Sequence, residues 1–186
     1  MEVATIPIIN NELERKKSIV ENTPAIFEIK ANPNAISTKS LIELHSQSEV
    51  VRWRGLIISS AQKHKVESKL AMAIMYMETT HGWYDNMYPD FLEKRFPMRK
   101  SILPMNIYYS YWKKLGVTKE LLNCPYYNID FGVILLARIQ ARIKNPTIAK
   151  IASIYNFLGA EKVNNYGARV NKIYQQQPWV LKKRRK

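Results

Sequence analysis

The chain has 186 residues, of which 46% are hydrophobic and 11% aromatic, so it can bury a sizeable core and wholesale disorder is excluded. It carries 29 Lys and Arg against 15 Asp and Glu, a formal net charge of +14. Such a surplus favours a polyanionic partner, which can be nucleic acid, anionic lipid or an anionic wall polymer. Cys124 is the only cysteine, which excludes an intrachain disulfide.

Residues 1–38 are polar and interrupted by Pro7, Pro24 and Pro33, and they predict an N-terminal arm or irregular lead-in. This segment lacks the basic start and continuous apolar run of a secretory signal. No stretch approaches the roughly 20 apolar residues of a membrane span. We therefore expect a protein made in the cytoplasm without a signal peptide and with no transmembrane segment.

Helical periodicity begins at about residue 39. Residues 40–66 place apolar side chains at intervals of three and four, which is typical of an amphipathic helix. Ser68 is expected to begin a second helix that ends at Glu78. Because that helix is apolar on nearly all sides, it should lie buried at the centre of the fold.

Residues 79–103 are expected to form a long loop with Gly82, Pro89 and Pro97 in it, and a short β-hairpin within it is an alternative. A loop of this length inside a compact domain is usually functional.

Later helices are predicted from Pro104, with Gly116 as the stop, and from Pro125. Two more are predicted over 146–159 and 163–174. The fold class is therefore all-α, with a helical domain over 39–178 and a basic C-terminal tail over 179–186.

Glu78 follows an apolar segment, and two interpretations of it are open. An exposed carboxylate at a helix end is ordinary. A carboxyl withdrawn from water beside aromatic residues has a raised pKa and can act as a general acid. The expected helix C-terminus at this position would raise the pKa further, since the helix dipole disfavours negative charge there.

Short motifs downstream favour the second interpretation. The chain carries, in order, Glu78-Thr79, Met105-Asn106-Ile107, Asn128-Ile129 followed by Gly132, and Tyr155-Asn156 followed by Gly159. This ordered set resembles the soluble lytic transglycosylase and goose-type lysozyme superfamily over roughly residues 50–175. The chain departs from the family pattern where Leu103-Pro104 replaces Gly-Leu and Asn106 replaces Gln.

The resemblance implies a lysozyme-like helical domain with the long loop over an active-site cleft. It implies cleavage of the MurNAc–GlcNAc β-1,4 linkage of peptidoglycan by a single Glu, so Glu78 would act first as acid and then as base. Tyr155 would orient the Glu78 carboxyl. The alternative for Tyr155 is a buried tyrosine hydrogen-bonded to the backbone.

The same resemblance implies a set of substrate-binding residues: Thr79, Trp83, Met105, Asn106, Asn128 and Asn156. Packing of the loop is an equal alternative for Trp83, and helix capping is the alternative for Asn156. Hydrolytic relatives use a second carboxylate to position water, and Asp85 or Asp90 would serve here. Carboxylates in a polar loop are more often simply solvated.

No metal site or cofactor is expected. His45, His64 and His81 show no metal-ligand spacing, and Cys124 lacks a recognisable base partner. The expected partner is peptidoglycan, with no obligatory nucleic acid.

A wall-cleaving enzyme without a signal peptide would act in the periplasm or cell wall of its producer or of a target cell. Two contexts fit that behaviour, a phage endolysin and an antibacterial effector. An effector would further imply an immunity protein and a secretion apparatus. The alternative function is a basic helical nucleic-acid-binding module, which would explain the charge but not the ordered motifs.

Overall fold

The computed structural model describes residues 28–38, 46–85 and 101–180. Within them the chain is mostly helical, which confirms the all-α class. The elements are α2 (Ser46–Lys63), α3 (Ser68–Asp85), β1 (Ser101–Ile102), β2 (Ile107–Tyr108), α5 (Tyr109–Lys113), α6 (Lys119–Asn123), α7 (Pro125–Gln140), α8 (Ile148–Asn156) and α9 (Asn165–Gln176). No helix in the described ranges is long and apolar enough to cross a membrane.

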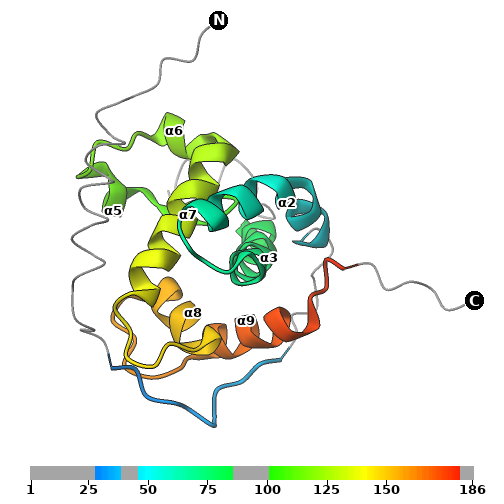
Figure 1. Ribbon diagram of the computed structural model, residues 1–186, viewed down its shortest axis with the longest axis vertical. Coiled ribbons are helices and arrows are strands. Elements are labelled where there is room, and N and C mark those ends of the chain that lie inside the picture. Colours follow the sequence, from blue (N-terminus) through cyan, green and yellow to red (C-terminus); the bar gives the residue numbers. More distant parts are fainter. Residues whose placement is uncertain (1–27, 39–45, 86–100, 181–186) are drawn as a thin grey trace, which may run out of the picture.

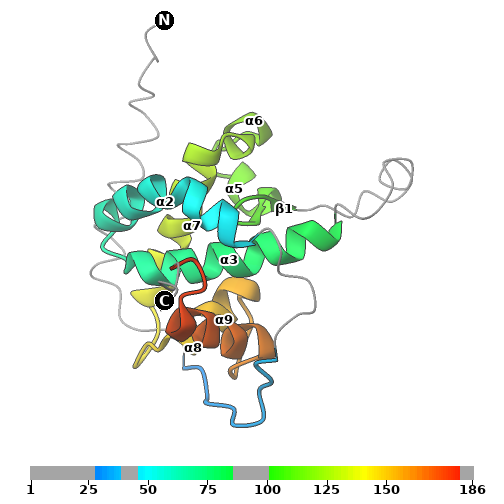
Figure 2. The ribbon, with the colours of Figure 1, turned by 90° about the vertical axis from the view of Figure 1, so that its right-hand side faces the viewer.

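Helix α3 is the centre of the fold. Figure 1 shows it end-on, with α2 and α7 on one side and α8 and α9 on the other, and Figure 2 shows it lengthwise between α2 and α9. All ten residues from 71 to 80 are buried. The prediction of a central helix, apolar all round, is therefore confirmed, because every side of α3 meets another element.

The predicted end of this helix was wrong. Helix α3 continues to Asp85, seven residues beyond Glu78, so it takes in the first part of the expected 79–103 loop. Thr79 donates its hydroxyl proton to the carbonyls of Met75 and Tyr76, and Thr80 donates to Tyr76. These bonds satisfy both hydroxyls within the helix, so the two threonines do not end it. Residues 86–100 lie outside the described residues.

The segment after residue 100 begins as a hairpin rather than a helix. Strand β1 pairs antiparallel with β2, with Ser101 opposite Tyr108 and Ile102 opposite Ile107. Pro104 lies in the connecting turn, after a cis peptide bond, and does not begin a helix as expected. Helix α5 starts only at Tyr109. The predicted stop is confirmed, because Gly116 has a φ of +80°, a conformation that glycine adopts without steric cost.

The later helices begin where local signals place them. Pro125 occupies the first turn of α7 as predicted. Thr147 caps α8 by accepting from the Lys150 amide, and Asn164 caps α9 by accepting from the Gly167 amide. The predictions of helices over 125–145, 146–159 and 163–174 are thus confirmed with shorter bounds.

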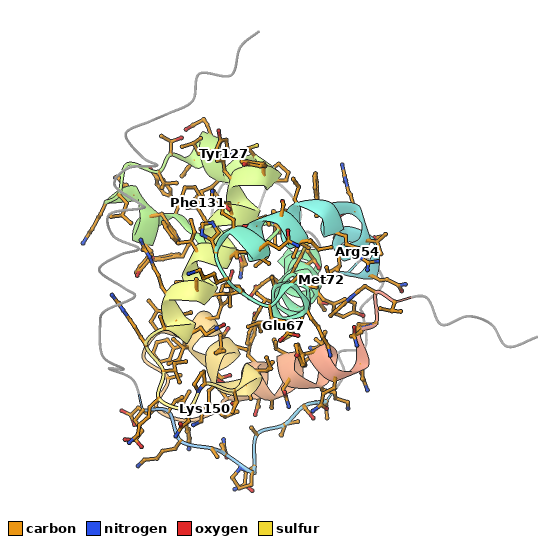
Figure 3. All side chains as sticks on the ribbon, viewed as in Figure 1. Arg54, Glu67, Met72, Tyr127, Phe131 and Lys150 are labelled. Carbon is orange, nitrogen blue, oxygen red and sulfur yellow. The ribbon has the colours of Figure 1, made fainter. Side chains whose placement is uncertain are left out.

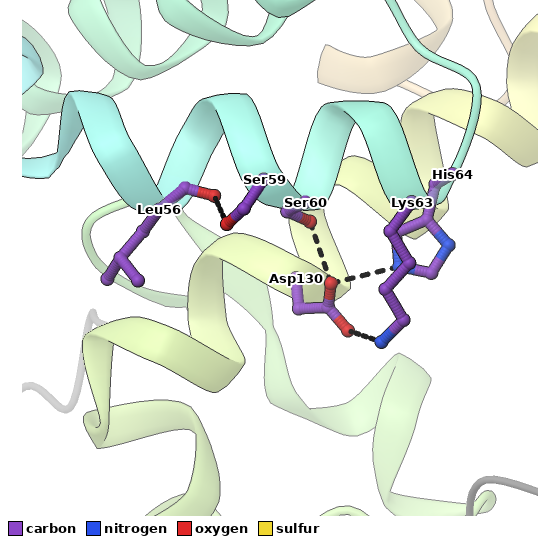
Figure 4. Close-up of polar contacts among 6 residues, drawn as sticks. All are labelled: Leu56, Ser59, Ser60, Lys63, His64 and Asp130. Atoms are coloured by element: carbon purple, nitrogen blue, oxygen red, sulfur yellow. Dashed lines mark hydrogen bonds and ion pairs between the residues drawn. The ribbon is translucent and has the colours of Figure 1, made fainter.

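A charged cluster joins α2 to α7 on one side of α3. Asp130 accepts hydrogen bonds from Ser60 at 2.7 Å and Lys63 at 3.1 Å, and its Oδ1 lies 2.9 Å from His64 Nε2 (Figure 4). Partial burial acts to raise the pKa of Asp130, but the hydrogen bonds and the neighbouring positive charges outweigh it and lower that pKa to about 2. Ser60 donates to Asp130 rather than to His64, so this cluster lacks a base-activated nucleophile.

Both predicted appendages contribute to the helical domain where they are described. In the lead-in, Ile29 is buried, and Lys30 forms backbone hydrogen bonds of 2.9 Å with Glu161 and Val163. At the other end Trp179, assigned to the tail, is buried with its ring 6.3 Å from that of Tyr76. These described parts of the lead-in and of the tail therefore pack against the helical domain, while residues 1–27 and 181–186 lie outside the description.

Candidate active site

Glu78 lies in the middle of α3 with only 2% of its surface exposed. Tyr166, from the first turn of α9, donates its hydroxyl proton to Glu78 Oε1. The other oxygen, Oε2, is buried, and no described residue donates a hydrogen bond of normal geometry to it. The Asn106 side chain lies near enough to influence the carboxyl, and Asn106 itself is partly exposed.

Burial controls the acidity of this carboxyl. Removal from water raises the pKa of Glu78 from its ordinary 4.5 to about 7, against smaller opposing effects of the Tyr166 and Asn106 side chains. The helix dipole does not explain the shift, since its influence is confined to the last turn and α3 ends seven residues later. A carboxyl with this pKa is protonated in a large fraction of molecules at neutral pH and can donate a proton.

Two tyrosines lie beside this carboxyl and differ in their partners. Burial, reinforced by the nearby Glu78 charge, raises the pKa of both Tyr155 and Tyr166 well above the usual 10.0, so both hydroxyls remain donors. Tyr155, expected to orient Glu78, instead donates at 2.7 Å to the carbonyl of Met105. Tyr166 makes the bond predicted for Tyr155. From the sequence Tyr166 was only one residue of the helix predicted over 163–174, so its contact with Glu78 was missed.

Asn128 supports the site from behind and is not exposed to a substrate. It is completely buried, accepts from the Met105 amide at 2.8 Å, and donates at 2.9 Å to the carbonyls of Ile102 and Leu122. These three bonds occupy both of its N–H groups and its oxygen. Its predicted role in substrate binding is therefore corrected to holding the hairpin turn against α7.

Met105 is held on three sides. Its amide and carbonyl bond to Asn128 and Tyr155, and its side chain is buried against Gly132, where an added Cβ would lie 2.7 Å from the Met105 Cβ. The turn thus presents Asn106, which has a φ of +55°, toward Glu78. The predicted substrate contact of Met105 is corrected to core packing, while Asn106 stays beside the carboxyl.

The remaining predicted residues fall into three groups. Thr79 is buried and bonded to its own helix, and its predicted substrate contact stays a prediction. Asn156 is exposed at the end of α8. The side chains of Trp83 and Asp85, and the whole of Asp90, lie outside the described residues, so the predictions for them stand as predictions.

A metal centre is not formed by the part of the chain that the structure describes, which contains no group of three or more His, Cys, Asp or Glu able to hold an ion.

Figure 3 shows how the side chains fill the space between the helices, with Met72 of α3 near the middle and Phe131 on α7. The candidate site therefore consists of Glu78, Tyr166 and Asn106, with Tyr155, Met105 and Asn128 as its support.

The burial of Glu78 predicts how stability depends on pH. The folded-state pKa of about 7 lies above the ordinary 4.5, so the contribution of the protonated carboxyl is fully present below pH 4.5 and is lost as pH rises through 7. The difference corresponds to about 3 kcal/mol. In urea unfolding at several pH values, the free energy of unfolding of Glu78→Gln relative to that of the natural protein should rise by this amount as pH increases from 4.5 to 8. A constant difference across that range would contradict the raised pKa.

Comparisons with protein-family models, with curated proteins and with solved structures found no match for this chain.

Proposed function

We propose that this protein cleaves the glycan strands of peptidoglycan at the MurNAc–GlcNAc β-1,4 linkage, with Glu78 as its acid and base. The observation that carries the proposal is a carboxyl buried in the central helix, with a pKa raised to about 7 and a tyrosine hydrogen-bonded to one oxygen. The ordered motifs that resemble lytic transglycosylases and goose-type lysozymes supply the substrate class.

The chemistry needs a proton and then a base. Glycosidic cleavage requires protonation of the leaving oxygen. Glu78 Oε2, to which no described residue donates a hydrogen bond of normal geometry, is the oxygen that we assign to deliver that proton. In the lytic transglycosylase reaction the resulting carboxylate then accepts a proton from the C6 hydroxyl of MurNAc, which closes a 1,6-anhydro ring. In hydrolysis a water molecule, positioned by Asp85 or Asp90, would supply that proton instead.

The test is cleavage of purified sacculi. The protein should clear a band in a gel containing cell walls, and mass spectrometry of the soluble products should show 1,6-anhydro ends for a transglycosylase or reducing ends for a muramidase. Absence of any glycan cleavage at pH 5 to 7 by the folded protein would overturn the proposal. Binding to DNA or RNA in the absence of wall cleavage would support the nucleic-acid alternative, which the charge of +14 motivates.

The biological setting belongs to the same proposal. The two settings that fit the proposed wall cleavage are a phage endolysin and an injected antibacterial effector. A protective effect of one neighbouring gene product on cells that receive this protein in the periplasm would identify an immunity protein and favour the effector.

The two tyrosines give a prediction that separates them. Tyr166→Phe removes the hydrogen bond to Glu78 and should lower the cleavage rate roughly 10- to 100-fold, a barrier increase of about 1.4–2.7 kcal/mol. Because this bond stabilises the ionised carboxylate, the pKa of Glu78 should rise and the alkaline limb of the pH–rate profile should move to higher pH.

Tyr155→Phe is the control, since it removes a partly buried tyrosine hydroxyl near Glu78 whose bond goes to the Met105 carbonyl. The alkaline limb of the pH–rate profile of Tyr155→Phe should stay at the same pH as in the natural protein. If both variants shift the alkaline limb equally, the hydrogen bond from Tyr166 does not specifically control the pKa of Glu78.

A further inference from the structure

Two arginines lie together at the C-terminal end of α7, on the side that faces α5. Phe131 and Arg138 are seven residues apart on α7 and both contact Trp112 of α5: the two ring centroids are 4.9 Å apart, and the Arg138 Cζ lies 5.6 Å from the centre of the Trp112 ring. Arg142 lies in the turn just after α7, where its amide donates to the Ile139 carbonyl, and its charge acts on the Arg138 guanidinium. Tyr111 is exposed next to Trp112 and influences Arg138 electrostatically.

Neither guanidinium has an acidic partner within the described ranges. The ion pairs found there join Arg52 to Glu49, Lys63 and His64 to Asp130, and Lys144 to Glu28. Partial burial lowers the pKa of Arg138, Tyr111 opposes this, and the charge of Arg142 lowers it further. Two like charges that are close together and partly withdrawn from water repel one another, and this costs stability unless an anion joins them.

Arg142 also has a buried hydrogen-bond donor without an acceptor among the described residues. Its Nε–H is buried, and no described residue accepts a hydrogen bond from it. A buried charged donor without an acceptor is costly, and such groups in folded proteins commonly meet an ion or a water molecule. The position of Arg138 in the last turn of α7 is explained by the helix dipole, but that explanation does not extend to the buried Nε of Arg142.

We propose that Arg138 and Arg142 form a binding site for a phosphate group, supplied by a phosphodiester polymer of the cell wall. A phosphate presents oxygens in several directions, so one group can accept from two guanidiniums at once and relieve their repulsion. The site goes beyond glycan cleavage and does not depend on Glu78, which lies on a different helix.

A base-free polymer of the wall is the polyanion that the proposed glycan cleavage would meet, so this choice of polymer rests on the proposed function. Trp112 is buried and its ring is covered by Arg138, so this ring cannot stack on a nucleobase, although the neighbouring Tyr111 is exposed. The net charge of +14 attracts any polyanion to the surface, and the arginine pair then selects the phosphate group.

The first experiment follows the arginine Nε–H resonances by NMR while inorganic phosphate is added at constant ionic strength. Signals of Arg138 and Arg142 should shift and saturate. Arg142→Lys keeps the charge but removes the Nε donor, and it should weaken phosphate binding about tenfold or more. Arg54→Lys is the matched control, because Arg54 is exposed on α2, away from Phe131 of α7 (Figure 3), and its substitution should leave binding unchanged.

If the NMR signals of all arginines shift alike and never saturate, the proposed site is overturned. This outcome is read on the natural protein, so it does not depend on whether a variant folds. A second titration compares a glycerol-phosphate oligomer with a single-stranded DNA of equal phosphate number. Arg142→Lys should weaken binding of the glycerol-phosphate oligomer. If the substitution weakens only DNA binding, the assignment to a wall polymer is overturned.

Discussion

Glu78→Gln should abolish glycan cleavage, with a loss of about 100-fold to 10,000-fold or more, while the protein stays folded. Gln matches Glu in size and its carbonyl oxygen can still accept from Tyr166, but it cannot deliver a proton to the leaving oxygen. The rate should be measured on purified sacculi at pH 5 to 6, where the natural carboxyl is protonated. Circular dichroism should show unchanged helix content.

Glu67→Gln is a control of matched chemistry. Glu67 accepts a hydrogen bond from Tyr174 of α9 at 2.7 Å, just as Glu78 accepts from Tyr166 of the same helix, but Glu67 is exposed just before the start of α3. The same substitution there should leave the rate within a factor of about two, because a surface contact of this kind contributes little. A folded Glu78→Gln protein that cleaves as fast as the control would remove Glu78 from the mechanism.

Gly167→Ala should destabilise the fold by roughly 3 kcal/mol, because α8 and α9 meet at this glycine. A Cβ at Gly167 would overlap the Ser153 hydroxyl and the Ala149 carbonyl oxygen. Ser153 cannot turn away without loss, since it donates to Ala149 at 2.7 Å and accepts from the Asn164 amide at 3.1 Å. The helices must therefore separate, and Tyr166, the preceding residue, must move relative to Glu78.

The control is Gly55→Ala. Gly55 lies inside α2 with nothing within 4 Å of an added Cβ, so alanine there should stabilise the protein by roughly 0.5–1 kcal/mol through helix propensity. Urea unfolding at pH 5 should thus move the two variants in opposite directions, and Gly167→Ala should also lose activity at temperatures where it remains folded. Equal stabilities would show that α8 and α9 do not pack closely at Gly167.

Local sequence signals determined where most helices lie. Proline in the first turn of α7, caps at Thr147 and Asn164, and glycine after α5 act through contacts within one turn, which a sequence displays directly. The apolar character of residues 70–77 also marked α3 as central, and with it Glu78 as a carboxyl withdrawn from water.

The end of α3 and the start of the hairpin could not be predicted in this way. Thr79 and Thr80 look unfavourable in a helix, yet burial of this part of α3 among α2, α7 and α9 outweighs their weak propensities, and the helix continues through Gly82. Pro104 is equally compatible with a helix start and with a turn, and the pairing of β1 with β2 decided between them.

The partners of the buried polar groups were decided by tertiary structure alone. Tyr155 and Tyr166 are both tyrosines on apolar helix faces, and which hydroxyl reaches Glu78 depends on how closely α9 approaches α8 at Gly167. Asn128 became a support for the hairpin turn because its three hydrogen-bonding partners come from segments separate in sequence. The sequence by itself thus determined where most helices lie and marked Glu78 as a carboxyl within an apolar segment, because both depend on neighbours along the chain. Only the packing of distant elements could decide which side chains surround that carboxyl, because a buried polar group bonds to whatever the fold brings within about 3 Å.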